Sequence, residues 1–361
     1  NRIFSSHRER SAAINQLPLG MRLALLLLLG AVGTGAASRS APQRGRLVLV
    51  RHGQSVWNDL NLFTGWADPG LTLLGRNEAL NAGRLLHSHG VLVDTAFCSR
   101  LRRASQTLDI ILGELGADPP IIRSWRLNEQ HCGALTGFNK RDLAVEHGEV
   151  RVFDWRRNPQ SRPPPANGQL PELANRLGSR IAPVEQRRSC QLNGPLAESL
   201  VDACDRYRPL WRHGIAPLLR RGQTVLVAGH GNMLRGAVRE IEQLSDDQMS
   251  CFELPQATPI IFEFDSDLRP VTPSMLRDGG EHVTALKSTR GCFLGDEEHV
   301  RRMQAQSAAA HSHGPRLCSG IDDAGEPHGH ARIEVVAPSQ FAPQRGAAAA
   351  CCQMTVKLAL A

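Results

Sequence analysis

The chain has 361 residues, with 42 Lys and Arg against 35 Asp and Glu, which gives a formal net charge of +7. This length suits one large α/β domain with terminal segments. The ordinary shares of apolar (41%) and charged (21%) residues exclude a disordered or fibrous protein. A basic protein can bind nucleic acid, a membrane or small anions. No long Lys/Arg run and no nucleic-acid-binding module is present, so the charge favours a small anionic ligand.

Residues 1–45 precede the first predicted element and are interpreted as an N-terminal extension. Met21 and Arg22 are followed by the apolar run 23–30 and by small residues up to Ser38, an order typical of a signal sequence or of the first half of an organelle address. The apolar run is too short for a stable membrane span. Two interpretations stay open. Residues 1–45 are a targeting segment for a plastid-type organelle, or they are not part of the translated protein, and the protein would then be cytoplasmic.

Short apolar runs rich in β-branched residues predict buried strands, and amphipathic stretches between them predict helices. In chain order we expect a strand at 46–50, a helix at 73–87, a strand at 93–98, a helix at 102–115, a short strand from 121, and strands at 225–229 and 259–264. The expected core-facing side of the first helix carries Leu74, Ala79, Leu80 and Leu85. Strands alternating with helices predict an α/β fold, a three-layer sandwich with a mainly parallel central sheet.

Histidine and arginine gather where the predicted strands end, at the edge at which such sheets bind ligands. Arg51 and His52 end the first strand, His230 ends a later one, and Arg103 follows the second. Gly53 is expected to let the chain turn sharply after the first strand. Arginine pairs with phosphate oxygens, and a neutral imidazole can carry a phosphoryl group. A lone histidine here is more often structural, but the set together predicts phosphoryl transfer through a histidine.

Longer motifs surround these residues. They are the segments 51–58, 62–66, 124–129, 135–140, 155–157, 198–200, 229–236 and 293–298. In this order they resemble the signature of cofactor-dependent phosphoglycerate mutases of the histidine phosphatase superfamily. The resemblance runs over residues 46–303, the expected catalytic domain, with a loop insertion at about 274–291. Residues 304–361 are expected to be a disordered tail, and a metal site at its histidines (His311, His313, His328 and His330) is the weaker alternative.

The resemblance also implies a role for individual residues. His52 would be the phosphohistidine, and Arg51, Arg103 and His230 would surround the transferring group. Glu129 would exchange a proton with the substrate hydroxyl. Substrate binding would fall to Asn58, Thr64, Gly65, Cys132, Lys140, Arg156, Arg157, Gly231 and Asn232.

By the same resemblance the protein would interconvert 3-phosphoglycerate and 2-phosphoglycerate in glycolysis and gluconeogenesis. It would be primed by 2,3-bisphosphoglycerate, need no metal, and form a homodimer or homotetramer. The expected partner is a small-molecule phosphoglycerate, and the sequence predicts neither a nucleic-acid partner nor a stable membrane span.

The sequence departs from the family pattern near the expected acid/base residue. The family commonly reads Glu-Arg-His-Tyr-Gly where this chain has Gln130 and Cys132 at the second and fourth positions. We therefore expect activity with weaker substrate binding. A phosphatase of the same fold, acting on bisphosphoglycerate or another ester, and a catalytically silent scaffold are the alternatives. Lys140, Arg156 and Arg157 favour the mutase over the phosphatase, because they would hold the far end of a short dianionic substrate.

Overall fold

A computed structural model of the chain describes residues 44–166, 196–277 and 283–302, apart from 286–288, 296–297 and 299. All of these residues lie in one compact unit, Asn1–Pro315. The expected tail 304–361 with its histidines, and all but the last two residues of the expected N-terminal extension, lie outside the described residues. Among the helices that are described, none has the length and apolar character needed to cross a membrane.

The centre of the described fold is an eight-stranded sheet in the order β3-β2-β4-β1-β5-β8-β7, with β6 paired to β5. Its strands are β1 (Gly45–Arg51), β2 (Thr95–Cys98), β3 (Ile121–Arg123), β4 (Thr224–Gly229), β5 (Ile260–Phe264), β6 (Pro270–Val271), β7 (Val283–Ala285) and β8 (Cys292–Leu294). The neighbours from β3 to β1 pair in parallel. The pairs beyond β1 are antiparallel.

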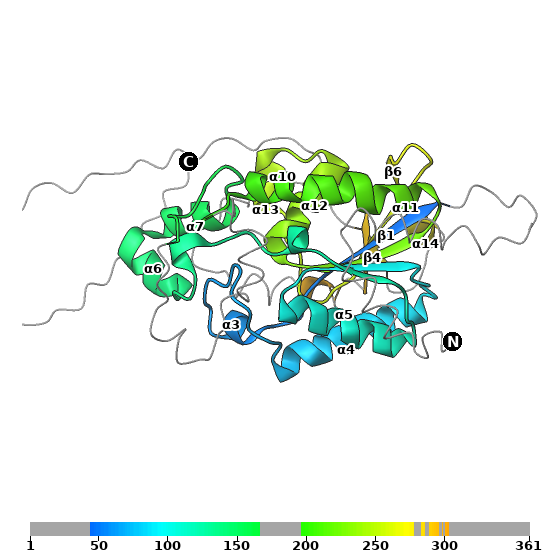
Figure 1. The fold of residues 1–361 in the computed structure, drawn as a ribbon, viewed down its shortest axis with the longest axis horizontal. Coiled ribbons are helices and arrows are strands. Elements are labelled where there is room, and N and C mark those ends of the chain that lie inside the picture. The colour runs from blue at the N-terminus through cyan, green and yellow to red at the C-terminus, as the bar shows by residue number, and fades with distance from the viewer. Residues whose placement is uncertain are drawn as a thin grey trace, which may run out of the picture. The chain divides into compact units, whose positions relative to one another are not determined.

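Helices cover both faces of this sheet (Figure 1). They are α3 (Val56–Asp59), α4 (Leu73–Ser88), α5 (Arg102–Leu115), α6 (Lys140–His147), α7 (Glu149–Arg157), α10 (Leu200–Leu210), α11 (Ala216–Arg220), α12 (Gly231–Glu242), α13 (Asp246–Cys251) and α14 (Ser274–Arg277). Short 3-10 turns form at Trp125–Leu127 and Gly133–Leu135, and a π-helical turn at Trp211–Ile215 links α10 to α11. The predicted α/β sandwich is confirmed, and the antiparallel strands extend its parallel centre.

The two helical layers each pack on one set of alternating strand residues, because successive side chains of a strand point to opposite faces. Leu47 and Leu49 of β1 join a core formed with α10, α11 and α12. Val48 and Val50 join a second core formed with α4 and α5. Figure 1 shows α4 and α5 on one side of the sheet and α10 to α12 on the other.

The predicted core face of α4 was wrong in part. Ala79 is fully buried, but Leu74 is 49% exposed. The buried side of α4 consists mostly of small residues, Gly75, Ala79, Ala82 and Gly83, together with Glu78 and Leu86. A Cβ atom on Gly83 would lie 2.7 Å from the Cβ of Glu114, so α4 approaches α5 closely along this stripe. The leucines therefore did not mark the contact face.

The segment expected to be a loop insertion contains regular structure. Its described residues include α14 and β7, and β7 pairs with β8 at the end of the sheet. These short elements extend the antiparallel half of the sheet, away from the parallel strands whose ends carry the predicted site.

Candidate active site

His52 follows β1 directly, and its ring is held in one protonation state. Its side chain is buried, and Nδ1 lies 2.7 Å from the carbonyl oxygen of Gly53. A carbonyl only accepts hydrogen bonds, so Nδ1 carries the proton and Nε2 does not. Nε2 accepts a bond from Nε of Arg103 at 3.2 Å. Burial, followed by the charges of Arg103 and Arg51, lowers the pKa of His52 well below 6.5. The ring is therefore neutral, with its nucleophilic nitrogen toward the guanidinium.

The turn after His52 depends on a close approach of two backbones. Gly53 was expected to let the chain turn sharply, and it does so without a positive φ. Instead, a Cβ on Gly53 would lie 2.2 Å from the carbonyl oxygen of Gly75, and a Cβ on Gly75 would lie 2.1 Å from that of Gln54. The N–H of Gly53 also donates to Oγ1 of Thr107. Glycine is needed here because there is no room for a side chain.

His230 follows β4 and lies beside His52. The two ring centroids are 5.0 Å apart, and the His230 side chain is fully buried. Its Nε2 is 2.7 Å from Oγ of Ser99, the residue after β2. Burial, then the charges of Arg103 and His52, lowers the pKa of His230 well below 6.5. Because β4 lies between β1 and β2, the strand order brings these three segments together.

Two arginines flank the paired histidines. Arg103, at the start of α5, is 1% exposed and donates to the carbonyl oxygens of Ala67 and Gly65 at 2.8 and 2.9 Å. Burial lowers its pKa to about 10, so it stays charged at neutral pH. Arg51 donates to the carbonyl oxygen of Leu254 at 2.9 Å. Arg103 therefore has a fixed position beside His52, and Arg51 is fixed at the end of β1.

These residues open onto one pocket. It is lined by Arg51, His52, Asn58, Leu62, Phe63, Thr64, Gly65, Arg103, Glu129, Gln130, Cys132, Lys140, Trp155, Arg156, Arg157, Gly231, Asn232, Arg235, Glu253, Leu254 and Gln256. Every predicted site residue except His230 lines this pocket, and His230 adjoins it through His52. Across the described part of the chain, no three His, Cys, Asp or Glu side chains come together as a metal site.

The same region of sequence matches a family model. Residues 47–191 match the histidine phosphatase superfamily (branch 1). This part of the chain is therefore similar to that superfamily.

Solved structures with a similar chain path include two phosphatases and a hydrolase. A mycobacterial glucosyl-3-phosphoglycerate phosphatase is 23% identical, over 60% of this chain and 92% of that one, with a TM-score of 0.46. The α-ribazole phosphatase of Shigella flexneri is 22% identical, over 61% and 91%, with a TM-score of 0.45. A mycobacterial hydrolase is 20% identical, over 75% and 99%, with a TM-score of 0.48. Similarity at this level does not extend to a substrate.

Glu129 lies at the N-terminal end of α12. Its Oε1 accepts bonds from the backbone N–H groups of Asn232 and Met233 at 3.1 and 3.2 Å. Helix N-termini favour negative charge, since their first N–H groups have no partner within the helix. The resemblance assigns Asn232 to substrate binding. In this structure the backbone N–H of Asn232 donates to Glu129.

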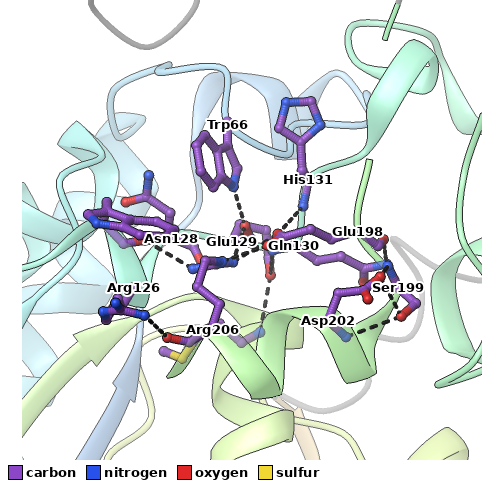
Figure 2. A network of polar contacts seen from close by, with 12 residues as sticks. Trp66, Arg126, Asn128, Glu129, Gln130, His131, Glu198, Ser199, Asp202 and Arg206 are labelled. Atoms are coloured by element: carbon purple, nitrogen blue, oxygen red, sulfur yellow. Dashed lines mark hydrogen bonds and ion pairs between the residues drawn. The ribbon is translucent and has the colours of Figure 1, made fainter. Parts of the chain in front are cut away.

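A buried ion pair holds the loop that carries Glu129 (Figure 2). Arg206 of α10 pairs with Glu198 at 2.6 Å and donates to the carbonyl oxygens of Asn128 and Glu129. Glu198 in turn accepts the N–H of His131 at 3.0 Å. Figure 2 shows Arg206 and Glu198 directed toward the segment that carries Asn128, Glu129 and His131. Each backbone group bonded in this way fixes the path of the loop past the pocket.

The two departures from the family motif lie on the same wall. Gln130 is buried, donates to the carbonyl oxygen of Glu198 and accepts from the side chain of Asn232, so it joins the network. Cys132 lies against Gly65, where a Cβ would be 3.2 Å from its sulfur. Burial raises the pKa of the Cys132 thiol to about 12, so this side chain faces the pocket as an uncharged group.

The far side of the pocket is basic. Lys140 begins α6, and Arg156 and Arg157 end α7. The two helices are held together by a small core that includes Leu143, Val152 and other apolar residues. Burial, followed by the charge of Arg156, lowers the pKa of Lys140 to about 7. For Arg156, burial and then the charge of Arg157 lower the pKa to about 9.

Asn58 serves two purposes at the mouth of this pocket. Its Oδ1 accepts bonds from the N–H and hydroxyl of Ser55 in the capping box of α3, and from Gln256 at 3.2 Å. The side-chain nitrogen is then the atom with which Asn58 could donate to a phosphate oxygen.

Sequence reasoning missed four residues that complete the site: Ser99, Arg235, Glu253 and Gln256. Arg235 stands within the motif at 229–236 and Ser99 directly follows the strand predicted at 93–98, but nothing in the pattern linked either to a partner. Arg235 is buried and donates to the side chain of Asn232 at 3.0 Å. Glu253 and Gln256 come from the loop before β5, and only the folded chain places them beside residues of α7 and α3.

Proposed function

We propose that this protein transfers phosphoryl groups through a phosphorylated His52, and that its activity is the interconversion of 3-phosphoglycerate and 2-phosphoglycerate. The observation that carries the proposal is the state of His52. It is neutral, its unprotonated Nε2 faces Arg103, and it opens onto a pocket whose lining also includes Lys140, Arg156 and Arg157. A neutral imidazole among fixed cations is what attack on a phosphate ester requires.

The proposed transfer has two halves that mirror each other. In the first, the lone pair of His52 Nε2 attacks phosphorus, a P–N bond forms, and the P–O bond to the ester oxygen breaks. Glu129, as the carboxylic acid, gives that oxygen its proton. In the second half, Glu129 takes a proton from a substrate hydroxyl, whose oxygen attacks phosphorus as the P–N bond breaks. Arg51 and Arg103 offset the charge on the transferring group.

The far side of the pocket supports a substrate that carries a second anionic group. Lys140, Arg156 and Arg157 line the same pocket as His52, and a lone phosphate held by His52, Arg51 and Arg103 would not need them. A three-carbon acid with a phosphate at one end and a carboxylate at the other fits this division of charge.

The primer implied by the resemblance is 2,3-bisphosphoglycerate, which when bound would supply the phosphoryl group that loads His52. The donors of the pocket fit such a molecule, since arginines stand both beside His52 and at the far side. His52, Arg51 and Arg103 would hold the phosphate to be transferred, and Lys140 with Arg156 would hold the opposite end.

Hydrolysis of a phosphate ester is the second candidate. The same histidine and arginines would serve it, and one observation favours it: Gln130 and Cys132 replace a cation and an aromatic hydroxyl of the mutase motif in the wall beside Glu129. Gln130 is bonded within the protein through both ends of its amide. A weaker hold on the acceptor hydroxyl would let water compete for phospho-His52.

One experiment separates the two candidates. The full chain is assayed for 2-phosphoglycerate formed from 3-phosphoglycerate, with and without 2,3-bisphosphoglycerate, and for free phosphate. His52→Ala is the test variant, and His87→Asn, an exposed histidine of α4, is the matched control. We expect isomerisation that needs the bisphosphate, persists in His87→Asn and is lost in His52→Ala. Release of phosphate without isomerisation would establish the phosphatase, and no reaction of either kind would refute both.

A further inference from the structure

Glu253 places a carboxylate inside the basic side of the pocket. It lies between α13 and β5, lines the pocket, and forms an ion pair with NH2 of Arg157. The side chain of Arg157 is 9% exposed and that of Glu253 is 28% exposed. The pair is therefore set into the wall and still open to the pocket.

The charge of Glu253 reaches the other cations of this wall. Burial and then Arg157 lower the pKa of Arg235 to about 9, and Glu253 is the acid that opposes this most strongly. Glu253 is likewise the acid that opposes the lowered pKa of Arg156. It also acts on Arg51, where only Glu129 opposes the effect of burial more. Glu253 is thus the counter-ion of a group of four arginines.

A fixed carboxylate changes what such a group of cations can bind. Arg157 is already paired, so a ligand anion must either displace Glu253 or lie beside it. The repulsion grows with the ligand's charge, and it is larger for a phosphate dianion than for a carboxylate monoanion. Repulsion of the wrong ligand is a common source of specificity.

We propose that Glu253 is a specificity-determining residue that disfavours a phosphate at the far side of the pocket and favours a carboxylate there. The inference rests on the proposed function, since it assigns the far side to the second anionic group of the substrate. In a mutase it would weaken the hold on each species that places a phosphate at the far side, the bisphosphate among them. The doubly phosphorylated species would then turn around or leave the pocket more readily.

The test compares the binding of two ligands to two proteins that cannot turn them over. His52→Ala is titrated by calorimetry with 2,3-bisphosphoglycerate and with 3-phosphoglycerate, and so is the double variant His52→Ala/Glu253→Gln. The amide keeps the shape of the side chain and removes its charge. Glu240→Gln in the same background removes a carboxylate from a surface pair with Arg208 and serves as the matched control.

We expect Glu253→Gln to tighten binding of the bisphosphate by about tenfold or more, as one unit charge removed at close range predicts. Binding of 3-phosphoglycerate should tighten clearly less, and Glu240→Gln should change neither. Thermal unfolding checks that each variant is folded, and Glu253→Ser provides a second neutral variant.

Three results would overturn the inference. Equal tightening of both ligands would show a general charge effect without selectivity. Unchanged or weaker binding of the bisphosphate in both neutral variants would show that Glu253 supports the site instead. In either of these two cases, turnover that is present in the chain with His52 and lost in His52→Ala would still support the proposed function. Absence of binding by every protein would refute the inference and the proposed function together.

Discussion

Lys140 is the side chain whose charge in the empty pocket is most sensitive to pH near neutrality. Burial and the neighbouring arginines lower its pKa to about 7, so that near this pH the empty site holds a mixture of charged and neutral lysine. A bound anion favours the charged form, because an opposite charge stabilises an ammonium group. Ligand binding above this pKa must therefore take up a proton.

This predicts that anion affinity falls as pH rises through the pKa of Lys140. The dissociation constant of 3-phosphoglycerate, measured by calorimetry, should approach a tenfold increase per pH unit above about pH 7, since each ligand takes up about one proton. Lys140→Arg stays charged across this range and should show a flatter dependence. Ionisation of the ligand is common to both proteins, so parallel curves for the two would contradict the prediction.

At the residue scale, sequence reasoning named residues that stand in motifs and missed residues that are linked to the pocket only by a contact. His52, Arg103 and Lys140 stand in recognisable runs of sequence, and the folded chain brings them to one pocket. Glu253 has no such run around it. Its importance lies in its pairing with Arg157, 96 positions earlier in the chain, and no local pattern encodes that pairing.

Replacing a glycine by alanine is expected to destabilise the protein at one position, the loop after β1, and to stabilise it at another, in α5. Gly53→Ala should destabilise the fold and abolish activity, since the new Cβ would lie 2.2 Å from the carbonyl oxygen of Gly75. Gly113 is exposed in α5, and no atom outside its own helix lies within 4 Å of a Cβ added there. Gly113→Ala should therefore stabilise the protein by about 0.5–1 kcal/mol, the difference in helix propensity.

Chemical denaturation of both variants, with turnover measured alongside, checks the pair. Activity should be retained in Gly113→Ala. A Gly53→Ala protein as stable and active as the parent would show that the loop after β1 can shift. The close approach of Gly53 to the backbone of Gly75 would then not be needed for activity.

Element boundaries were predicted most accurately where the hydrophobic pattern alone defined the element. The helix expected at 102–115 has those bounds as α5, and the strand expected at 46–50 is the centre of β1. For α4 the bounds were close, but the face was partly wrong, because close packing against α5 selects small residues over leucines. The sequence also did not predict that β5 runs antiparallel to β1, since a buried strand of either direction can be a continuous apolar run.

At the scale of the molecule, the site is made by strand order. β4 lies between β1 and β2, and it pairs with both along most of its length. Without β4, His52 and Ser99 would end two strands that have no contact with each other through the sheet, and His230 would be absent. The predicted homodimer or homotetramer stays a prediction, which light scattering after size exclusion would test.

The strand order predicts that a fragment of residues 45–223 does not fold, although it contains all of the 47–191 match to the family model. It lacks the strand that joins its two halves, and it leaves buried apolar surface of β1 and β2 exposed. Circular dichroism should show no cooperative thermal transition for the fragment. A cooperative transition like that of the whole chain would show that β1 and β2 can pair directly.

The position of β4 also matters while the chain is being made. Synthesis proceeds from the N-terminus, so β1 and β2 leave the ribosome more than a hundred residues before the strand that must fit between them. Until β4 has been synthesised, β1 and β2 expose apolar strand edges to which chaperones and other nascent chains can bind. His52 is thus translated early, but the strand that places His230 beside it is translated more than a hundred residues later.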